Sequence, residues 1–297
     1  MRMARGELGQ RVLVAAVGIP AAVLLIYLGS WYLGGLLAVA AALAAWEYYR
    51  LAAARGARPF VLPGVAFAAA IILVSTGWRG PAAGMALWQL TVAFTLALGV
   101  LAVLRRNQGE GPLSATAVTL TGALLPGGAL AFALFLRHMP ALDGLVGWGA
   151  WTGAAVVAYP MVVTWLNDTA AYFVGTHLGR RKLMPRVSPN KTWLGAEAGL
   201  VAGVIAGWLY AQFVFGGWLG IPLAPWLGAL GGALITVAAQ IGELAESVLK
   251  REAGVKDSGS LLPGHGGVLD RLDALLLAFP VAYWYLTLVF RWMGMAS

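Results

Sequence analysis

The sequence has 297 residues, of which 60% are hydrophobic and only 11% are charged, and it contains no cysteine. A soluble domain carries about 25% charged residues, so this composition excludes an ordinary soluble fold and predicts a helical membrane protein. The apolar runs lack the alternation of a membrane β-barrel. The net charge of +8 comes from short basic clusters between apolar runs. Such clusters are typical of loops that face the cytoplasm and anionic lipid, and they argue against nucleic acid as a partner.

Nine apolar runs approach the roughly 20 residues that are needed to cross a bilayer. The first run follows a basic start but has no convincing cleavage site, so we expect a span rather than a signal peptide. The third run is short enough to be re-entrant or tilted. In chain order, the predicted spans are Val12–Leu28, Tyr32–Ala53, Val61–Gly77, Met85–Leu104, Ala115–Leu136, Gly149–Val174, Leu194–Phe215, Pro225–Leu249 and Asp270–Trp292.

The distribution of basic residues orients these spans. With the N-terminus in the cytoplasm, 17 of the 20 lysines and arginines fall inside, and only Arg79, Arg137 and Arg291 fall outside. The positive-inside rule therefore predicts an all-α polytopic integral membrane protein with about nine transmembrane helices, a cytoplasmic N-terminus and an external C-terminus. We expect an N-terminal bundle of about five spans over residues 1–140 and a C-terminal catalytic region of about four spans over 141–297, with two cytoplasmic active-site loops.

One of these loops concentrates charge in the stretch "LKREAGVKDSGSLLPGHGGVLDRLDA", residues 249–274. Asp270 and Asp273 are three residues apart at the start of an apolar helix, so their carboxylates share one face and suit Mg²⁺. The glycines of "PGHGG" let backbone N–H groups approach an anion. The plain alternative is that the two aspartates only cap the helix. The cations of this segment are Lys250, Arg251, Lys256 and Arg271.

Several carboxylates fall within predicted spans, where a charge costs roughly 2.5 kcal/mol or more and is a functional candidate. We favour a functional role for Glu243, which lies deeper than Glu246. Asp168 either functions or forms a buried hydrogen bond that stabilises helix packing. Glu47 lies near a helix end, three residues before Arg50, and this spacing favours a structural ion pair.

The second polar loop, "THLGRRKLMPRVSPNKTWLG" over residues 176–195, precedes another apolar helix. Ser188, Lys191 and Thr192 supply hydroxyls and an ammonium where a helix N-terminus can bind phosphate. No Walker A pattern occurs in the chain. Residues 180–182 are interpreted as an ordinary topology signal.

The segment Ser247–Asp273 resembles the signature of the phosphatidate cytidylyltransferase family, the CDP-diacylglycerol synthases. Its pattern is Ser-x-x-Lys-Arg, four residues, Lys-Asp, then Pro-Gly-His-Gly-Gly and Asp-Arg-x-Asp, and every position is filled at the expected spacing. "NDTAAYFVG" and "SPNKTWLG" are similar to further family segments. Three residues depart from the usual pattern: Asn190 replaces Lys, Leu194 replaces Glu and Glu243 replaces Asp.

The resemblance implies an enzyme that transfers the cytidylyl group of CTP to phosphatidic acid, giving CDP-diacylglycerol and pyrophosphate, with Mg²⁺ as cofactor. It also suggests a homodimer. Abundant Ala, Gly and Arg suggest a bacterium, and hence an inner-membrane protein with its active site facing the cytoplasm. The resemblance implies metal binding by Glu243, Asp270 and Asp273, and phosphate binding by Lys250, Arg251, Lys256 and Arg271. Asp257 and His265 would orient these cations or protonate the leaving pyrophosphate. Ser188, Lys191 and Thr192 would contact the nucleotide, and Asp168 would line the same cavity.

Two other functions fit parts of the sequence. A CTP-dependent lipid-alcohol kinase would transfer the γ-phosphate to a neutral acceptor, and His265 or Asp257 would then serve as general base. An ion-coupled membrane transporter would use Glu243 and Asp168 as an ion or proton path. The complete signature argues against the kinase, and the lack of repeated halves argues against the transporter.

Overall fold

A computed structural model describes residues 5–78, 81–142, 149–261 and 266–295. The chain divides into two compact units. Unit 1 comprises residues 1–134 and 249–272, and unit 2 comprises residues 135–248 and 273–297. The signature segment therefore contributes to both units, because Asp270 belongs to unit 1 and Asp273 to unit 2.

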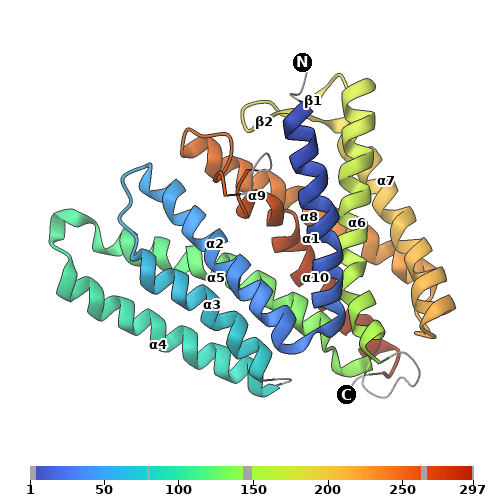
Figure 1. Ribbon diagram of the computed structural model, residues 1–297, viewed down its shortest axis with the longest axis horizontal. Coiled ribbons are helices and arrows are strands. Elements are labelled where there is room, and N and C mark those ends of the chain that lie inside the picture. The colour runs from blue at the N-terminus through green and yellow to red at the C-terminus, as the bar shows by residue number, and fades with distance from the viewer. Residues whose placement is uncertain (1–4, 79–80, 143–148, 262–265, 296–297) are drawn as a thin grey trace. The chain divides into compact units, whose positions relative to one another are not determined.

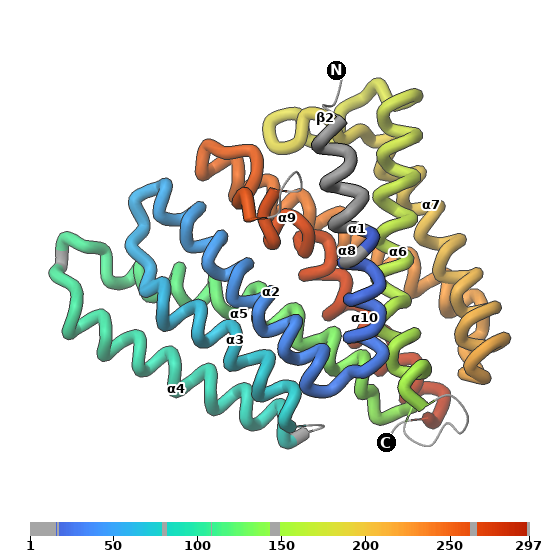
Figure 2. Tube along the Cα trace, viewed as in Figure 1, coloured from blue at the N-terminus to red at the C-terminus, as the bar shows by residue number. Residues whose placement is uncertain are grey.

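Unit 1 is built mainly from helices α1 to α5, joined by the last residues of α8 and by the short helix α9. Helices α2 and α3 pack together, and α4 packs against α3 (Figure 2). Tyr49 of α2 donates to the carbonyl of Thr119 in α5 at 2.7 Å, which ties these helices together. The bounds are α1 Arg5–Leu28, α2 Ser30–Ala53, α3 Val61–Gly77, α4 Pro81–Arg105, the 3₁₀ turn η1 Gln108–Glu110, α5 Pro112–Arg137 and α9 Leu269–Leu272.

Unit 2 packs α6 against α7, with α10 also against α6 (Figure 1). Tyr159 of α6 and Tyr285 of α10 donate to the carbonyls of Gly228 and Leu227 in α8, each at 2.6 Å, so buried tyrosines join three helices. The bounds are η2 Pro140–Leu142, α6 Ala150–His177, β1 Lys182–Met184, β2 Ser188–Thr192, α7 Trp193–Leu209, the π-helix η3 Tyr210–Trp218, α8 Pro225–Glu252 and α10 Leu275–Trp292.

Each predicted apolar run is helical, and the bounds of the third, Val61–Gly77, coincide with those of α3. Six helices among the described residues are long and apolar enough to cross a membrane. Gly18–Leu28 and α3 are shorter, and α6, which carries Asn167 and Asp168, is outside this set. The membrane-protein class is therefore supported, while the nine-span count and the orientation of the termini stay predictions.

The second polar loop contains a short antiparallel sheet, which the prediction of an all-α protein missed. Strands β1 and β2 pair Lys182 with Thr192 and Met184 with Ser188. Pro189 has no N–H to donate, and a two-stranded sheet tolerates this because both of its strands are edges. At the end of β2, the Thr192 hydroxyl accepts from the N–H of Gly195 at 3.1 Å and caps α7.

Glycines bring α7 and α8 into backbone contact within unit 2. A Cβ added to Gly203 would collide with the Thr236 hydroxyl, and one added to Gly207 would collide with the carbonyl of Gly228. Small residues allow such close approach of helices in membranes, where packing drives association.

We expect Gly207→Ala to lower the free energy of unfolding by about 1–3 kcal/mol, because the added methyl group overpacks a backbone contact that cannot yield. Denaturant unfolding in mixed micelles measures this. The matched control is Gly35→Ala in α2, where a Cβ meets open space and the change should be neutral or slightly stabilising. Equal stability of the two variants would contradict this account of the α7–α8 contact.

Candidate active site

The first candidate site lies in unit 1 and consists of Glu47, Lys250, Ser258, Gly267 and Asp270, which we call the signature cluster. Asp270 is in the first turn of α9. One of its oxygens accepts from the Lys250 ammonium at 2.6 Å. The other accepts from Gly267 N at 2.8 Å and from the N–H and hydroxyl of Ser258, both at 2.9 Å. Asp270 therefore has three donors of its own, and the Ser258 hydroxyl is a fourth within reach.

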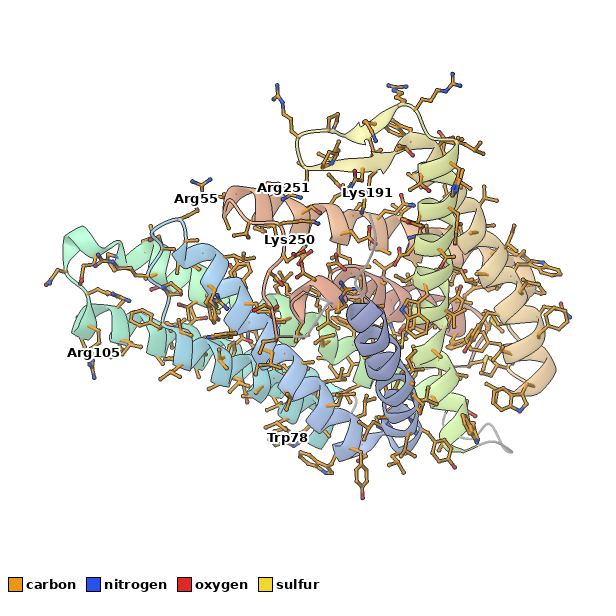
Figure 3. All side chains as sticks on the ribbon, turned by 45° about the horizontal axis from the view of Figure 1, so that its top comes forward. Arg55, Trp78, Arg105, Lys191, Lys250 and Arg251 are labelled. Atoms are coloured by element: carbon orange, nitrogen blue, oxygen red, sulfur yellow. The ribbon has the colours of Figure 1, made fainter. Side chains whose placement is uncertain are left out.

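The Lys250–Asp270 ion pair is largely removed from solvent, since the two side chains are 12% and 7% exposed. Lys250 lies in the last turn of α8 (Figure 3), where a cation also interacts favourably with the helix dipole. A buried pair contributes little net stability, but loss of one partner leaves an uncompensated charge and is costly. The pair thus holds one ammonium group at a fixed position.

Glu47 of α2 belongs to the cluster, although its position in the sequence favoured only a structural ion pair; Ser258 was not identified from the sequence. The Glu47 side chain is fully buried. The sequence predicted Arg50 as its partner, but the carboxylate instead accepts hydrogen bonds from Ser258, Val268 and Leu269. The guanidinium of Arg50 lies 4.9 Å from the ring centroid of Trp46.

Four other predicted residues of the signature segment lie at its surface. Lys256, Asp257 and Arg271 are exposed. Arg251, which is also exposed, donates to the carbonyl of Val255 at 3.0 Å and so closes the turn after α8. His265 lies outside the described residues. The structure leaves the catalytic roles of these five residues as predictions.

The second candidate site is a cavity of about 500 Å³ within unit 2, lined by α6, the β1–β2 hairpin, α7 and α8. Lys191, labelled in Figure 3, forms an ion pair with Glu243 there. Asp168 and Thr192 also line the cavity, and so does Lys182. Ser188, which was predicted beside them, is not among the lining residues. The cavity therefore gathers Asp168, Lys191, Thr192 and Glu243 from three separate stretches of sequence.

Two amide side chains orient Asp168 within this cavity. Gln240 donates to the side-chain oxygen of Asn167 at 2.9 Å and to the carbonyl of Ala196 at 3.0 Å. Asn167, which is 1% exposed, donates in turn to Asp168 at 2.8 Å. Sequence reasoning missed Gln240. Its position three residues before Glu243 on the same helix face was the available signal.

The carboxylates of unit 2 provide a donor set for a divalent cation. Asp168 lies close enough to Glu243 and Asp273 to interact electrostatically with both. Mg²⁺ is bound by one or two protein carboxylates together with water and phosphate oxygens, and these residues fit that requirement. Among the described residues, no group of three His, Cys, Asp or Glu side chains is placed to hold a metal ion by itself. The metal-binding roles of Glu243, Asp270 and Asp273 stay predictions.

Comparison with known proteins shows a match to the Cytidylyltransferase family over residues 9–289. The chain belongs to this family. It is 36% identical over 281 residues to a phosphatidate cytidylyltransferase of Pseudomonas aeruginosa, covering 92% of this chain and 95% of that protein. It is 31% identical over 306 residues to a phosphatidate cytidylyltransferase of Synechocystis sp., covering 94% of this chain and 97% of that protein.

A third relative in the cytidylyltransferase family is more similar over a shorter stretch. The phosphatidate cytidylyltransferase of Brucella suis is 49% identical over 133 residues, or 44% of this chain. The matched stretch spans about half of that relative, 46% of its length.

The signature cluster predicts a strong coupling between Lys250 and Asp270. We expect Lys250→Gln and Asp270→Asn each to lower the free energy of unfolding by about 3–5 kcal/mol, because each leaves a buried charge without its partner. The double variant should lose clearly less free energy of unfolding than the two single variants lose together. Mixed-micelle unfolding of the four proteins gives this double-mutant cycle.

The exposed pair Arg58 and Glu110, joined at 3.1 Å, offers a matched control for this cycle. Ion pairs at the surface are screened by solvent and contribute little to stability. Arg58→Gln and Glu110→Gln should therefore each change the free energy of unfolding only slightly, and the double variant should show the sum of the two changes. Additive losses for Lys250 and Asp270 as well would show that the pair is not energetically coupled.

Proposed function

We propose that this protein transfers the cytidylyl group of CTP to phosphatidic acid, releasing CDP-diacylglycerol and pyrophosphate. The observation that carries the proposal is the fixed Lys250–Asp270 pair, which lies in the segment with the complete family pattern. Relatives aligned over more than 90% of this chain bear the name phosphatidate cytidylyltransferase. These findings together favour a nucleotidyltransferase.

The reaction joins two anions. A phosphate oxygen of phosphatidic acid attacks the α-phosphorus of CTP, the bond from that phosphorus to the bridging oxygen of the β-phosphate breaks, and pyrophosphate leaves with the electron pair. The attacking phosphate is ionised near neutral pH, so it needs little help from a general base. The protein's task is to neutralise charge and to align the groups.

The side chains divide this task by charge. Lys250, fixed by Asp270, would stabilise negative charge on the phosphates, and Arg251, Lys256 and Arg271 would add to this field. Asp257 and His265 would orient these cations or protonate the leaving pyrophosphate. The acyl chains of the lipid require only access from the bilayer, which explains the placement of a nucleotide enzyme among apolar helices.

The nucleotide would occupy the cavity of unit 2. Its volume of about 500 Å³ falls within the range of small-molecule sites, about 300–1,000 Å³. Lys191 provides a cation there, Asp168 and Thr192 provide oxygen atoms, and Ser188 on the same strand is the remaining predicted contact. The ion pair of Lys191 with Glu243 would position the ammonium before CTP binds.

Mg²⁺ would be held by Glu243 and Asp273, with Asp168 beside them. When bound, the ion supplies neutralisation of phosphate charge and polarisation of the α-phosphate. Asp270 was included in this set from the sequence, and its hydrogen bonds with Lys250, Ser258 and Gly267 also support a role as the anchor of Lys250.

The membrane arrangement is part of the proposal. Nine spans with a cytoplasmic N-terminus and an external C-terminus would place both polar loops in the cytoplasm, where CTP is available. The N-terminal bundle would end near residue 140 and the catalytic region would follow. We place the protein in the bacterial inner membrane as a homodimer, on the family resemblance and composition.

The reaction type is tested with purified protein in detergent, Mg²⁺, phosphatidic acid and CTP labelled at either the α- or the γ-phosphate. We expect α-label in the lipid and γ-label in pyrophosphate, because cytidylyl transfer cleaves the bond between the α- and β-phosphates. Asp270→Asn should lower this activity at least about a hundredfold through misplacement of Lys250.

Other outcomes of the labelling experiment separate the alternatives. Transfer of γ-label to a lipid alcohol would replace the proposal with a kinase. No transfer to any lipid, from a preparation that retains its fold, would favour the transporter.

The nucleotide site is tested by Lys191→Gln. Loss of a charge-assisted contact costs about 1.5–3 kcal/mol, so the KM for CTP should rise roughly tenfold or more, while the KM for phosphatidic acid stays the same. Arg186→Gln is the matched control, because Arg186 is an exposed cation of the same hairpin outside the lining of the cavity. An unchanged KM for CTP in Lys191→Gln would place the nucleotide elsewhere.

A further inference from the structure

The buried carboxylate of Glu47 binds a segment that is 211 to 222 residues away along the chain. One of its oxygens accepts from Val268 N at 3.0 Å. The other accepts from Leu269 N at 2.8 Å and from the Ser258 hydroxyl at 2.9 Å. Since Glu47 is fully buried, these groups take the place of the water that an exposed carboxylate would bind.

Three consecutive backbone N–H groups are divided between two carboxylates. Gly267 N donates to Asp270, and the next two, Val268 N and Leu269 N, donate to Glu47. Leu269 begins α9 and the other two residues precede it directly, so none of these N–H groups has a partner within the helix. Glu47 therefore fixes the backbone immediately before Asp270.

The Ser258 hydroxyl connects the same two carboxylates. Its oxygen lies 2.9 Å from an oxygen of Glu47 and 2.9 Å from an oxygen of Asp270. A hydroxyl has a single proton to donate, so Ser258 holds the two acids close together without satisfying both at once. A shift of the Glu47 carboxylate would therefore change the hydrogen bonding of Asp270.

Two glycines make room for the Glu47 carboxylate. A Cβ on Gly267 would collide with the Ser258 hydroxyl and with Glu47, and a Cβ on Gly259 would also meet the Glu47 carboxylate. The signature segment thus makes room for the Glu47 carboxylate at two positions, Gly259 and Gly267.

We propose that Glu47 is a positioning residue for the cytidylyl transfer. It holds Ser258 and residues 267–269 so that Asp270 faces Lys250, and it acts through them without touching substrate. The inference rests on the proposed function and extends it to a helix outside the signature segment.

The test compares Glu47→Gln with the wild-type protein. The amide keeps the size of the side chain but turns one of its two acceptors into a donor, which then faces an N–H or hydroxyl donor. We expect kcat to fall roughly a hundredfold, as for a displacement of about 1 Å at the reacting groups, with the KM for CTP changed less than about twofold. Backbone amide exchange should accelerate in peptides covering 258–261 and 266–270 and stay unchanged in a peptide containing Lys191.

Two further variants sharpen the test. Glu110→Gln makes the same chemical change on a partly exposed carboxylate of unit 1 and should leave kcat, KM and exchange unchanged. Ser258→Ala removes the shared hydroxyl but leaves the backbone donors, so its loss of kcat should be smaller than that of Glu47→Gln and again without a change in KM.

The outcomes separate this inference from the proposed function. Wild-type kcat and unchanged exchange in Glu47→Gln would refute it. Accelerated exchange in every peptide, with kcat and KM both impaired, would show a general structural role and would also overturn it. If the wild-type protein transfers no cytidylyl group, the proposed function fails. Amide exchange needs no substrate, so it still tests whether Glu47 fixes the backbone of residues 258–261 and 266–270.

Discussion

A carboxylate among apolar helices requires donors close around it, and this requirement organises the polar parts of the structure. Water cannot serve as the partner inside such a bundle, and an unpaired buried charge costs several kcal/mol. Asp270 therefore has three donors of its own and Glu47 has two, and the Ser258 hydroxyl lies within hydrogen-bonding distance of both carboxylates. The donors come from a segment rich in glycine, where backbone N–H groups are accessible to an anion. The backbone path of that segment is therefore constrained by the two carboxylates that it surrounds.

The two units satisfy their acids in different ways. In unit 1, backbone N–H groups and one buried ammonium enclose Glu47 and Asp270, so the arrangement is fixed by the path of the chain. In unit 2, the side chains of Lys191, Asn167 and Gln240 serve Asp168 and Glu243 at the edge of a cavity. Side-chain donors can exchange partners when an anion enters, whereas backbone donors within a closed turn cannot. This difference suits a rigid cation in unit 1 and a ligand-binding role in unit 2.

Local sequence patterns were sufficient for the helices and for the family. The apolar runs became helices because their length and composition allow little else, and the signature was recognisable because its residues are consecutive. The partners of Glu47 were not predictable, since hydrogen bonds across more than 200 residues leave no spacing rule in the sequence. The β1–β2 hairpin was missed because Pro189 and the basic residues around it are typical of a loop. Gln240 was overlooked because an amide in a span is less conspicuous than a charge.

The glycines of the signature illustrate how one physical requirement can have two interpretations. From the sequence, their freedom predicted backbone N–H groups that approach a phosphate. In the structure, Gly267 N donates to Asp270, and the missing side chains at Gly259 and Gly267 make room for Glu47. Both interpretations need an anion close to the backbone, and the pattern alone does not distinguish a substrate from a side chain. Here the glycine-rich segment encloses the protein's own carboxylates, and one of these, Asp270, holds the ammonium of Lys250.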